Sequence, residues 1–230
     1  MTAPQLGLPF PPVRTRAEAF VEGAGNRDAL DRLAAWSDAL ERPGRPLAVV
    51  IALTGPPGSG KSRLLAREAR SFGATVRGPS ADFEAELADA HAVFVDDAHE
   101  MPPLDLFALI EACARGRTPL GITGAGRLAD WAGTGPDKLP DLVSRLGAVA
   151  HAQLGPPDEA MLAEVLSAQL GRRGLRAPLA SVAEAAGKLR REYAAAIGIA
   201  ETAERLASKG YKKPAALLRD ALAAAPEHTL

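Results

Sequence analysis

A chain of 230 residues is long enough for one sizeable hydrophobic core and a smaller second module. Its 27 lysines and arginines against 28 aspartates and glutamates give a formal net charge of −1, which argues against strong autonomous binding to DNA. One cysteine, Cys113, excludes an internal disulfide framework. The absence of a leader or of an apolar run of membrane-spanning length leads us to expect a cytoplasmic protein that does not enter a membrane.

The first thirteen residues predict an extended tail, because their prolines remove backbone donors and Gly7 adds conformational freedom. The string QLGLPF within this tail nevertheless carries three apolar side chains, Leu6, Leu8 and Phe10. Either the tail packs on its own domain or it binds a partner.

Strand and helix patterns then alternate. A helix is expected at about 26–41, and the continuous apolar run 47–54 predicts a buried parallel strand. Further strands are expected at 74–78, 92–97 and 119–124, with helices after GPPGSGKS, at about 81–90 and at 104–116. This alternation predicts an α/β fold with a parallel, doubly wound sheet.

Only helical patterns follow the turn-rich LGPPDE at 154–159. The expected helices are 158–172, 178–187, 189–208 and 214–224. We therefore divide the chain into a tail at 1–13, an α/β domain at 14–155 and a small all-helical domain at 156–230.

Two side chains and one turn have simple structural interpretations. Cys113 is expected to be a small buried hydrophobe, and Trp131 is expected to be a core anchor, with an interface residue as the alternative. The basic turn SKGYKK at 208–213 is interpreted as a solvated helix connection, with contact to an anionic partner as the alternative.

The string GPPGSGKS fits the pattern G-x-x-x-x-G-K-[ST] directly after a predicted strand and directly before a predicted helix. Backbone N–H groups of such a loop, together with the helix N-terminus, cradle phosphate oxygens. Lys61 would reach the β- and γ-phosphates and Ser62 would hold Mg²⁺. The alternative is a glycine-rich turn with an incidental lysine. The nucleotide-binding residues expected here are Gly55, Pro56, Pro57, Gly58, Ser59, Gly60, Lys61, Ser62 and Arg63.

Two carboxylates end the strand AVFVDD. Asp96 lies where ligands bind in open α/β sheets and would help to hold Mg²⁺, while Asp97 could polarise an attacking water. The alternative is that the pair caps the next helix. The four histidines are dispersed, so the only metal expected is the Mg²⁺ that accompanies a nucleotide.

Five further strings extend this picture, in their order along the chain: FVEGAGN, VFVDDAH, GITG, DLVSRL and LRREYAAAI. Together with the P-loop they resemble the DnaA-type AAA+ ATPases over nearly the whole chain. The resemblance implies a P-loop NTPase of the AAA+ type, in which a helical lid follows the sheet, and ATP or ADP with Mg²⁺ as cofactor.

The resemblance also assigns roles to single residues. It implies that FVEGAGN covers the adenine and that Thr123 or Gly124 occupies the sensor-1 position. Arg145 of DLVSRL, which we expect on a loop after the far strand of the sheet, matches an arginine finger that reaches the nucleotide of an adjacent protomer. Arg191 of LRREY matches the sensor-2 arginine of the lid. From residue type alone, Arg145 could instead pair with Asp141, and Arg191 could be a solvated charge.

This sequence departs from the resemblance in two places. Relatives read T-[GS]-D-R-P-P after the third core strand, whereas this chain reads TGAGRLAD, with Ala125 in place of the acid. We therefore expect weak hydrolysis of its own nucleotide. DnaA continues into a helix-turn-helix domain, whereas this sequence ends at Leu230, so we expect no binding to replication origins.

QLGLPF resembles the peptide by which several replication proteins bind the sliding clamp, the β subunit of DNA polymerase. Gln5 can both donate and accept hydrogen bonds, Leu8 and Phe10 can fill an apolar pocket, and Pro9 limits the entropy lost on docking. Leu6 belongs to the same clamp-binding peptide. The expected partners are therefore the clamp and DnaA. Because an arginine finger reaches an adjacent protomer, self-association is a further possibility.

Three functions are compatible with these residues. The first is an adaptor that docks on the clamp and presents Arg145 to ATP-bound DnaA, which prevents re-initiation. The second is an autonomous AAA+ ATPase that loads or remodels a replication protein. The third is a small-molecule kinase, which would need a second substrate site. The tail and the charge balance favour the adaptor.

Overall fold

The computed structural model describes residues 20–42, 49–80, 82–83, 87, 90–135, 138–209 and 214–230. QLGLPF lies outside these residues, as do most of the helix expected at about 81–90 and most of the SKGYKK turn.

The centre of the molecule is a sheet of parallel strands in the order β2-β3-β4-β1-β5. Its strands are β1 (Val50–Thr54), β2 (Val76–Arg77), β3 (Val93–Val95), β4 (Leu120–Gly124) and β5 (Ala150–Gln153). The first four lie within predicted strands. The edge strand β5 was not predicted, because its sequence AHAQ has one fully buried residue, Ala152, and lacks an apolar run.

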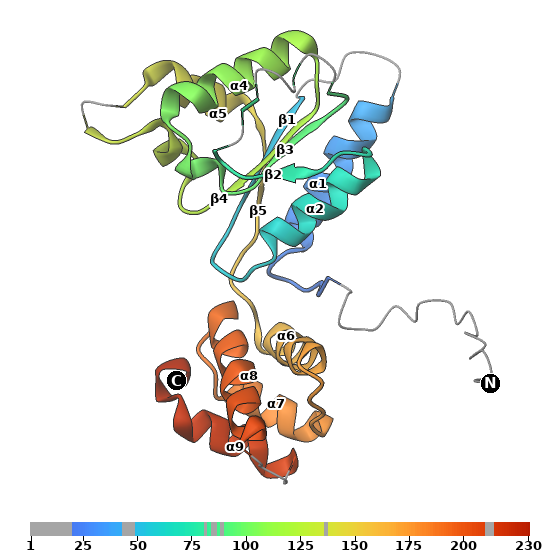
Figure 1. The fold of residues 1–230 in the computed structure, drawn as a ribbon, viewed down its shortest axis with the longest axis vertical. Coiled ribbons are helices and arrows are strands. Elements are labelled where there is room, and N and C mark those ends of the chain that lie inside the picture. Colours follow the sequence, from blue (N-terminus) through green and yellow to red (C-terminus); the bar gives the residue numbers. More distant parts are fainter. Residues whose placement is uncertain are drawn as a thin grey trace, which may run out of the picture.

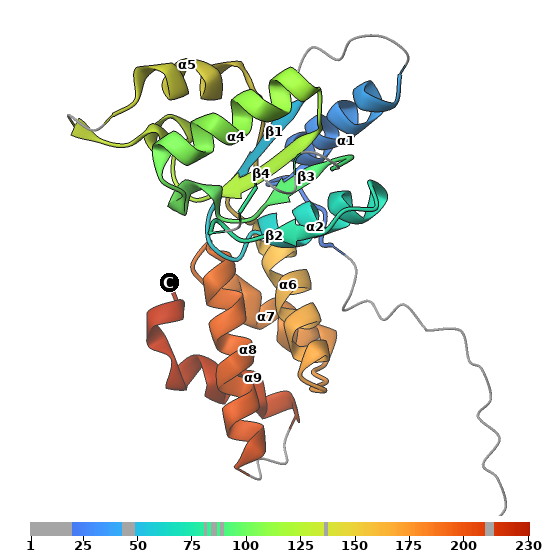
Figure 2. The same ribbon diagram turned by 45° about the horizontal axis from the view of Figure 1, so that its top comes forward.

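Helices cover both faces of this sheet (Figures 1 and 2). Helices α1 (Arg27–Glu41) and α2 (Lys61–Ser71) lie on one face, and α4 (Pro103–Gly116) and α5 (Pro140–Ala148) lie on the other. Side chains of β1 alternate between the two faces, as a strand requires. Ile51 and Leu53 join the core under α1 and α2, while Val50 and Ala52 join the core under α4 and α5. The predicted doubly wound α/β fold is confirmed.

Two predicted core residues lie on the α4 and α5 face. Cys113 is fully buried in α4, and this burial raises the pKa of its thiol to about 12. Trp131 is buried in the short helix η2 (Leu128–Ala132), where its indole N–H donates to the Ala125 carbonyl at 2.8 Å. Both predictions are confirmed.

The helices after β5 form a separate bundle below the sheet (Figure 1). They are α6 (Glu159–Arg172), α7 (Leu179–Gly187), α8 (Tyr193–Ser208) and α9 (Pro214–Ala224). A core cluster made only of residues between Leu162 and Ala225 holds them together. We call residues 20–153 the sheet part and residues 159–230 the helical part.

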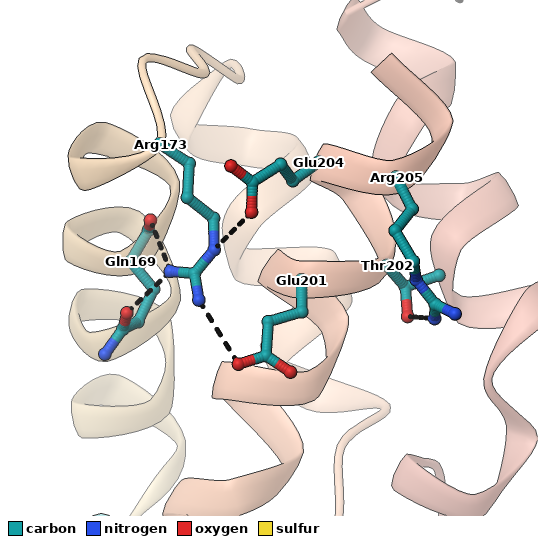
Figure 3. Close-up of polar contacts among 6 residues, drawn as sticks. All are labelled: Gln169, Arg173, Glu201, Thr202, Glu204 and Arg205. Atoms are coloured by element: carbon teal, nitrogen blue, oxygen red, sulfur yellow. Dashed lines mark hydrogen bonds and ion pairs between the residues drawn. The ribbon is translucent and has the colours of Figure 1, made fainter. Parts of the chain in front are cut away.

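A cluster of polar contacts joins α6 to α8 at the end of the helical part that is remote from the sheet (Figure 3). The Arg173 guanidinium contacts Glu201 at 3.3 Å and Glu204 at 3.2 Å. It also donates to the side chain of Gln169 at 2.7 Å. These contacts link the end of α6 to α8 through an Arg173 side chain that is mostly buried.

None of the helices within the described ranges is long and apolar enough to cross a membrane.

Candidate nucleotide-binding site

The P-loop connects β1 to α2 at the carboxyl edge of the sheet. Gly58 and Gly60 have φ values of 76° and 93°, which other residues rarely adopt. Gly60 is the residue before the first turn of α2, and a Cβ there would lie 2.6 Å from Cε2 of Phe20. Glycine at this position is therefore required both by the backbone and by the approach of the Phe20 ring.

The loop is built to receive an anion. The first backbone bond of α2 runs from the Leu64 N–H to the Gly60 carbonyl, so the preceding N–H groups have no intrahelical acceptor. The Ser59 hydroxyl is buried and has no hydrogen-bond partner within the described residues. Such donors at a helix N-terminus suit phosphate oxygens.

Lys61 lies across this loop. Its ammonium donates to the carbonyls of Gly55 at 3.0 Å and Pro56 at 3.2 Å. Burial lowers the pKa of Lys61, while the nearby carboxylates of Asp97 and Asp96 oppose that shift. The lysine charge therefore lies between the phosphate loop and the acidic strand end.

Asp96 and Asp97 follow β3, and Thr123 lies on the neighbouring strand β4. The Thr123 hydroxyl donates to the carboxylate of Asp96 and accepts the backbone N–H of Asp97 at 3.1 Å. Asp97 has a left-handed φ of 52°, and its side chain makes no cap hydrogen bond to the short helix that follows. The structure therefore does not support the alternative in which the side chains of this pair cap the next helix.

These residues fit a magnesium nucleotide. The donors of the P-loop fit phosphates, and Ser62 with Asp96 would hold Mg²⁺, which prefers oxygen ligands and keeps several waters. The metal would neutralise charge on the β- and γ-phosphates.

A cleft opens beside the P-loop, between the two parts of the molecule. Its walls come from the segment before α1, from the P-loop and α2, and from α6 and α8. The lining residues are Phe20, Val21, Gly58, Ser59, Gly60, Arg63, Val165, Ala168, Gln169, Arg172 and Tyr193. Phe20 and Val21 belong to FVEGAGN, so the segment expected to cover the adenine does line the cleft.

Two residues without a predicted role support this cleft. Asn26 is buried, donates to the Val21 carbonyl at 2.8 Å and accepts the Gly23 N–H at 2.9 Å, which fixes the FVEGAGN segment. The Tyr193 hydroxyl contacts the Gly155 carbonyl at 3.2 Å. Both lie in strings used for the resemblance, but only the fold shows what their side chains contact.

Arg191 lies in the connection that precedes α8, and not within a helix as the predicted range 189–208 implied. Leu189 gives that range an apolar helical spacing, but it pairs with Thr229 as a β-bridge. The Arg191 guanidinium contacts Glu159 at 3.0 Å, and both side chains are exposed. Arg191 does not lie among the described residues that line the cleft.

Arg145 lies in the last turn of α5, not on a loop after the far strand of the sheet, because DLVSRL continues a helix that begins at Pro140. Its guanidinium forms an ion pair with Glu111 of α4 and not with Asp141, and its side chain is 52% exposed. Helix α5 is on the opposite face of the sheet from α1 and α2 (Figures 1 and 2). The structure therefore does not bring Arg145 to the lysine and carboxylates of its own P-loop.

A five-stranded parallel sheet, a P-loop after β1 and a helical part after β5 define the AAA+ fold. Among solved structures, domain III of the Thermotoga maritima replication initiation protein DnaA has a TM-score of 0.69 and 16% identity, covering 96% of this chain and 99% of that one.

Two other solved structures are similar over most of this chain. The initiator DnaA bound to AMPPCP and single-stranded DNA has a TM-score of 0.64 and 16% identity, over 92% of this chain and 67% of that one. The Thermotoga maritima RuvB Holliday junction branch migration motor has a TM-score of 0.59 and 18% identity, over 90% of this chain and 73% of that one. No model of a known protein family matches the chain, and no curated protein matches it significantly.

Proposed function

We propose that this protein is a nucleotide-bound regulator of the replication initiator DnaA, of the kind represented by the DnaA-related regulator Hda. Its α/β domain (14–155) and helical lid (156–230) bind ADP or ATP with Mg²⁺. Its tail docks on the sliding clamp through Gln5, Leu6, Leu8, Pro9 and Phe10. Arg145 enters the nucleotide site of DnaA and stimulates ATP hydrolysis there, which limits re-initiation.

One observation carries this proposal, namely the position of Arg145. Its half-exposed guanidinium lies on α5, on the opposite face of the sheet from the helix that its own P-loop begins. It can act on a γ-phosphate only where a second protein brings one to that face. Glu111 restrains the guanidinium from the adjacent helix α4.

Nucleotide binding rests on the P-loop geometry. The orphan Ser59 hydroxyl, the open N-terminus of α2 and the Lys61 ammonium converge on one loop, and the cleft continues from that loop to Phe20. The similar DnaA structure bound to AMPPCP supports an adenine nucleotide here as well.

The test is ATP hydrolysis by DnaA with DNA-loaded clamp and this protein added. The wild type is expected to stimulate hydrolysis, and Arg145→Ala is expected to abolish stimulation, because an arginine supplied in trans contributes roughly 10³- to 10⁵-fold in GTPase systems. Gln5→Ala is expected to lose the stimulation as well, because the variant no longer docks on the clamp.

Arg32→Ala is the matched control. Arg32 is also a half-exposed arginine whose Nε contacts a carboxylate, that of Asp28 at 2.8 Å, but it lies on α1 across the sheet. The Arg32→Ala variant should stimulate ATP hydrolysis by DnaA as the wild type does. If Arg145→Ala stimulates equally well, the finger in trans is wrong.

A second candidate function is an autonomous AAA+ ATPase that loads or remodels a replication protein. The contact of Thr123 with Asp96 beside Lys61 favours it, because these are the groups that hydrolysis in cis requires. Rapid ATP turnover by this protein without DnaA or clamp would support this candidate against the regulator.

A further inference from the structure

The connection between α7 and α8, residues 188–192, is held by the C-terminal residues of the chain. The Arg190 N–H donates to the His228 carbonyl at 3.0 Å, and the Leu230 N–H donates to the Lys188 carbonyl at 2.9 Å. These two bonds make an antiparallel bridge between Leu189 and Thr229. Residues 226–230 therefore fix the backbone directly before Arg191, and we call them the strap.

The strap has a defined seat on the helical part. Its short helix η4 (Pro226–His228) packs on α8, and Leu189 beneath it is fully buried. The His228 ring lies against Gly198 of α8, where a Cβ would be 2.1 Å from Nε2. Figure 2 shows the chain end beside α8, close to the end of that helix that faces the sheet. The strap thus packs against the helix start that Arg191 precedes.

The Arg191 side chain depends on this backbone for its direction. Its contact with Glu159 is an exposed ion pair, and such pairs contribute little to the position of a side chain. The strap, in contrast, binds the main chain on both sides of Leu189 through hydrogen bonds of good length.

We propose that the strap positions Arg191 for contact with the bound nucleotide, with the main-chain groups of His228 and Leu230 as the positioning elements. This inference rests on the proposed nucleotide site and adds to it that Arg191, two residues before the cleft residue Tyr193, contacts the bound nucleotide. Nucleotide binding then depends on residues that themselves lie outside the cleft.

The first test compares Leu230→Pro with Leu230→Ala in equilibrium binding of ADP with Mg²⁺. The Leu230 side chain is 81% exposed, so Leu230→Ala keeps both the fold and the N–H donor. Leu230→Pro removes the N–H that bonds Lys188, and the extended conformation of Thr229 (φ −98°, ψ 161°) tolerates a following proline. Leu230→Pro should weaken ADP binding about two- to tenfold, as expected for one lost hydrogen bond, and Leu230→Ala should not.

The second test repeats Leu230→Pro in an Arg191→Ala background, with circular dichroism and thermal melting as checks of folding. If the strap acts through Arg191, Leu230→Pro causes no further loss of ADP affinity there. An equal loss in both backgrounds, or no loss in the wild-type background, would overturn the proposal. An Arg191→Ala variant that binds ADP as the wild type does would also overturn it while leaving nucleotide binding intact. Failure of the wild type to bind ADP would instead contradict the proposed function.

Discussion

His151 links the edge of the sheet to the start of the P-loop. Its Nε2 lies 2.8 Å from the hydroxyl of Thr54, the last residue of β1, and Gly55 follows directly. Burial lowers the pKa of His151, and the positive charge of Arg32 on α1 lowers it further. The imidazole is therefore neutral in the folded protein at neutral pH, and in the tautomer protonated at Nδ1 its Nε2 accepts a hydrogen bond from the Thr54 hydroxyl.

The lowered pKa makes the stability of the protein depend on pH in a definite direction. Between the lowered pKa in the folded state and the ordinary pKa of about 6.5 in the unfolded state, the unfolded chain binds more protons. The contribution of His151 is thus fully present above that ordinary pKa and is lost as the pH falls below it. Urea denaturation at pH 7.5 and pH 5.5 should show a larger loss of stability for the wild type than for His151→Gln.

Gln is the suitable replacement because its amide can occupy the position of Nε2 without titrating in this range. Carboxylates also titrate as the pH falls, but they do so in both proteins, so the difference between the two isolates the histidine. An identical pH dependence of the two proteins would contradict a neutral, partly buried His151.

At the scale of elements, the start of α2 depends on Gly60. Its φ of 93° sets the entry of the chain into the helix, and the Phe20 ring occupies the space of the missing side chain. The same glycine therefore shapes the phosphate loop and lets the segment before α1 close one wall of the cleft.

Gly60→Ala is expected to destabilise the protein by about 1–3 kcal/mol and to weaken ADP binding strongly, because it combines backbone strain with displacement of Phe20. Gly73→Ala is the matched control. Gly73 follows α2 with a φ of 65°, and a Cβ there meets nothing within 4 Å. Gly73→Ala should lower the stability of the protein through backbone strain alone and should leave the affinity for ADP unchanged. Equal losses of ADP affinity in the two variants would show that the Phe20 contact does not matter.

The elements that the sequence predicts well are those with an unbroken apolar pattern. The run that contains β1 has no polar residue before Thr54, and the P-loop motif fixes where α2 begins. The sequence does not reveal β5, because an edge strand with half-exposed Ala150 and His151 has no such pattern. It also misplaces the start of α8, since Leu189 is buried in the core of the helical part but pairs with Thr229 of the strap and does not lie in a helix.

The residues of the candidate site also divide into those that the sequence predicts and those that it does not. Residues that lie next to one another in the chain, such as Gly55 to Ser62, can be assigned from a motif. The cleft wall contributed by Gln169 and Tyr193 could not be, because these residues come from two helices whose sequence pattern reports only their own packing. Asn26 has a clear structural role only once its bond to Val21 is seen.

At the scale of the whole molecule, two hydrophobic cores are joined by few direct contacts. Among the described residues, the core of the helical part contains none from the sheet part. Within the described residues, hydrogen bonds run from the Tyr193 hydroxyl to the Gly155 carbonyl and from the Gly155 N–H to the Gly25 carbonyl at 2.6 Å, and Gly58 lies close to Ile197 of α8. A nucleotide in the cleft would contact both parts, so it should couple their unfolding.

Urea unfolding should therefore be non-coincident without nucleotide and coincident with it. Both tryptophans, Trp36 and Trp131, lie in the sheet part, so their fluorescence reports that part, whereas circular dichroism also reports the helical part. Without nucleotide, the dichroism should begin to fall at a lower urea concentration than the fluorescence changes. With ADP and Mg²⁺ at about 100 times the dissociation constant, the stability of the binding-competent state should rise by about 2.7 kcal/mol and the two curves should merge.

Gly60→Ala separates coupling by nucleotide from a general effect of ADP and Mg²⁺ on folding. This variant disturbs the P-loop wall formed by Phe20, which also packs against the sheet core, so its two curves are compared with and without ADP, and ADP should move neither. Coincident curves for the wild type without nucleotide would mean that the few contacts through Gly155 already couple the two parts. The cleft would then bind a nucleotide between parts that are already coupled. In that case the helical part would still set the position of the Arg191 side chain through the strap.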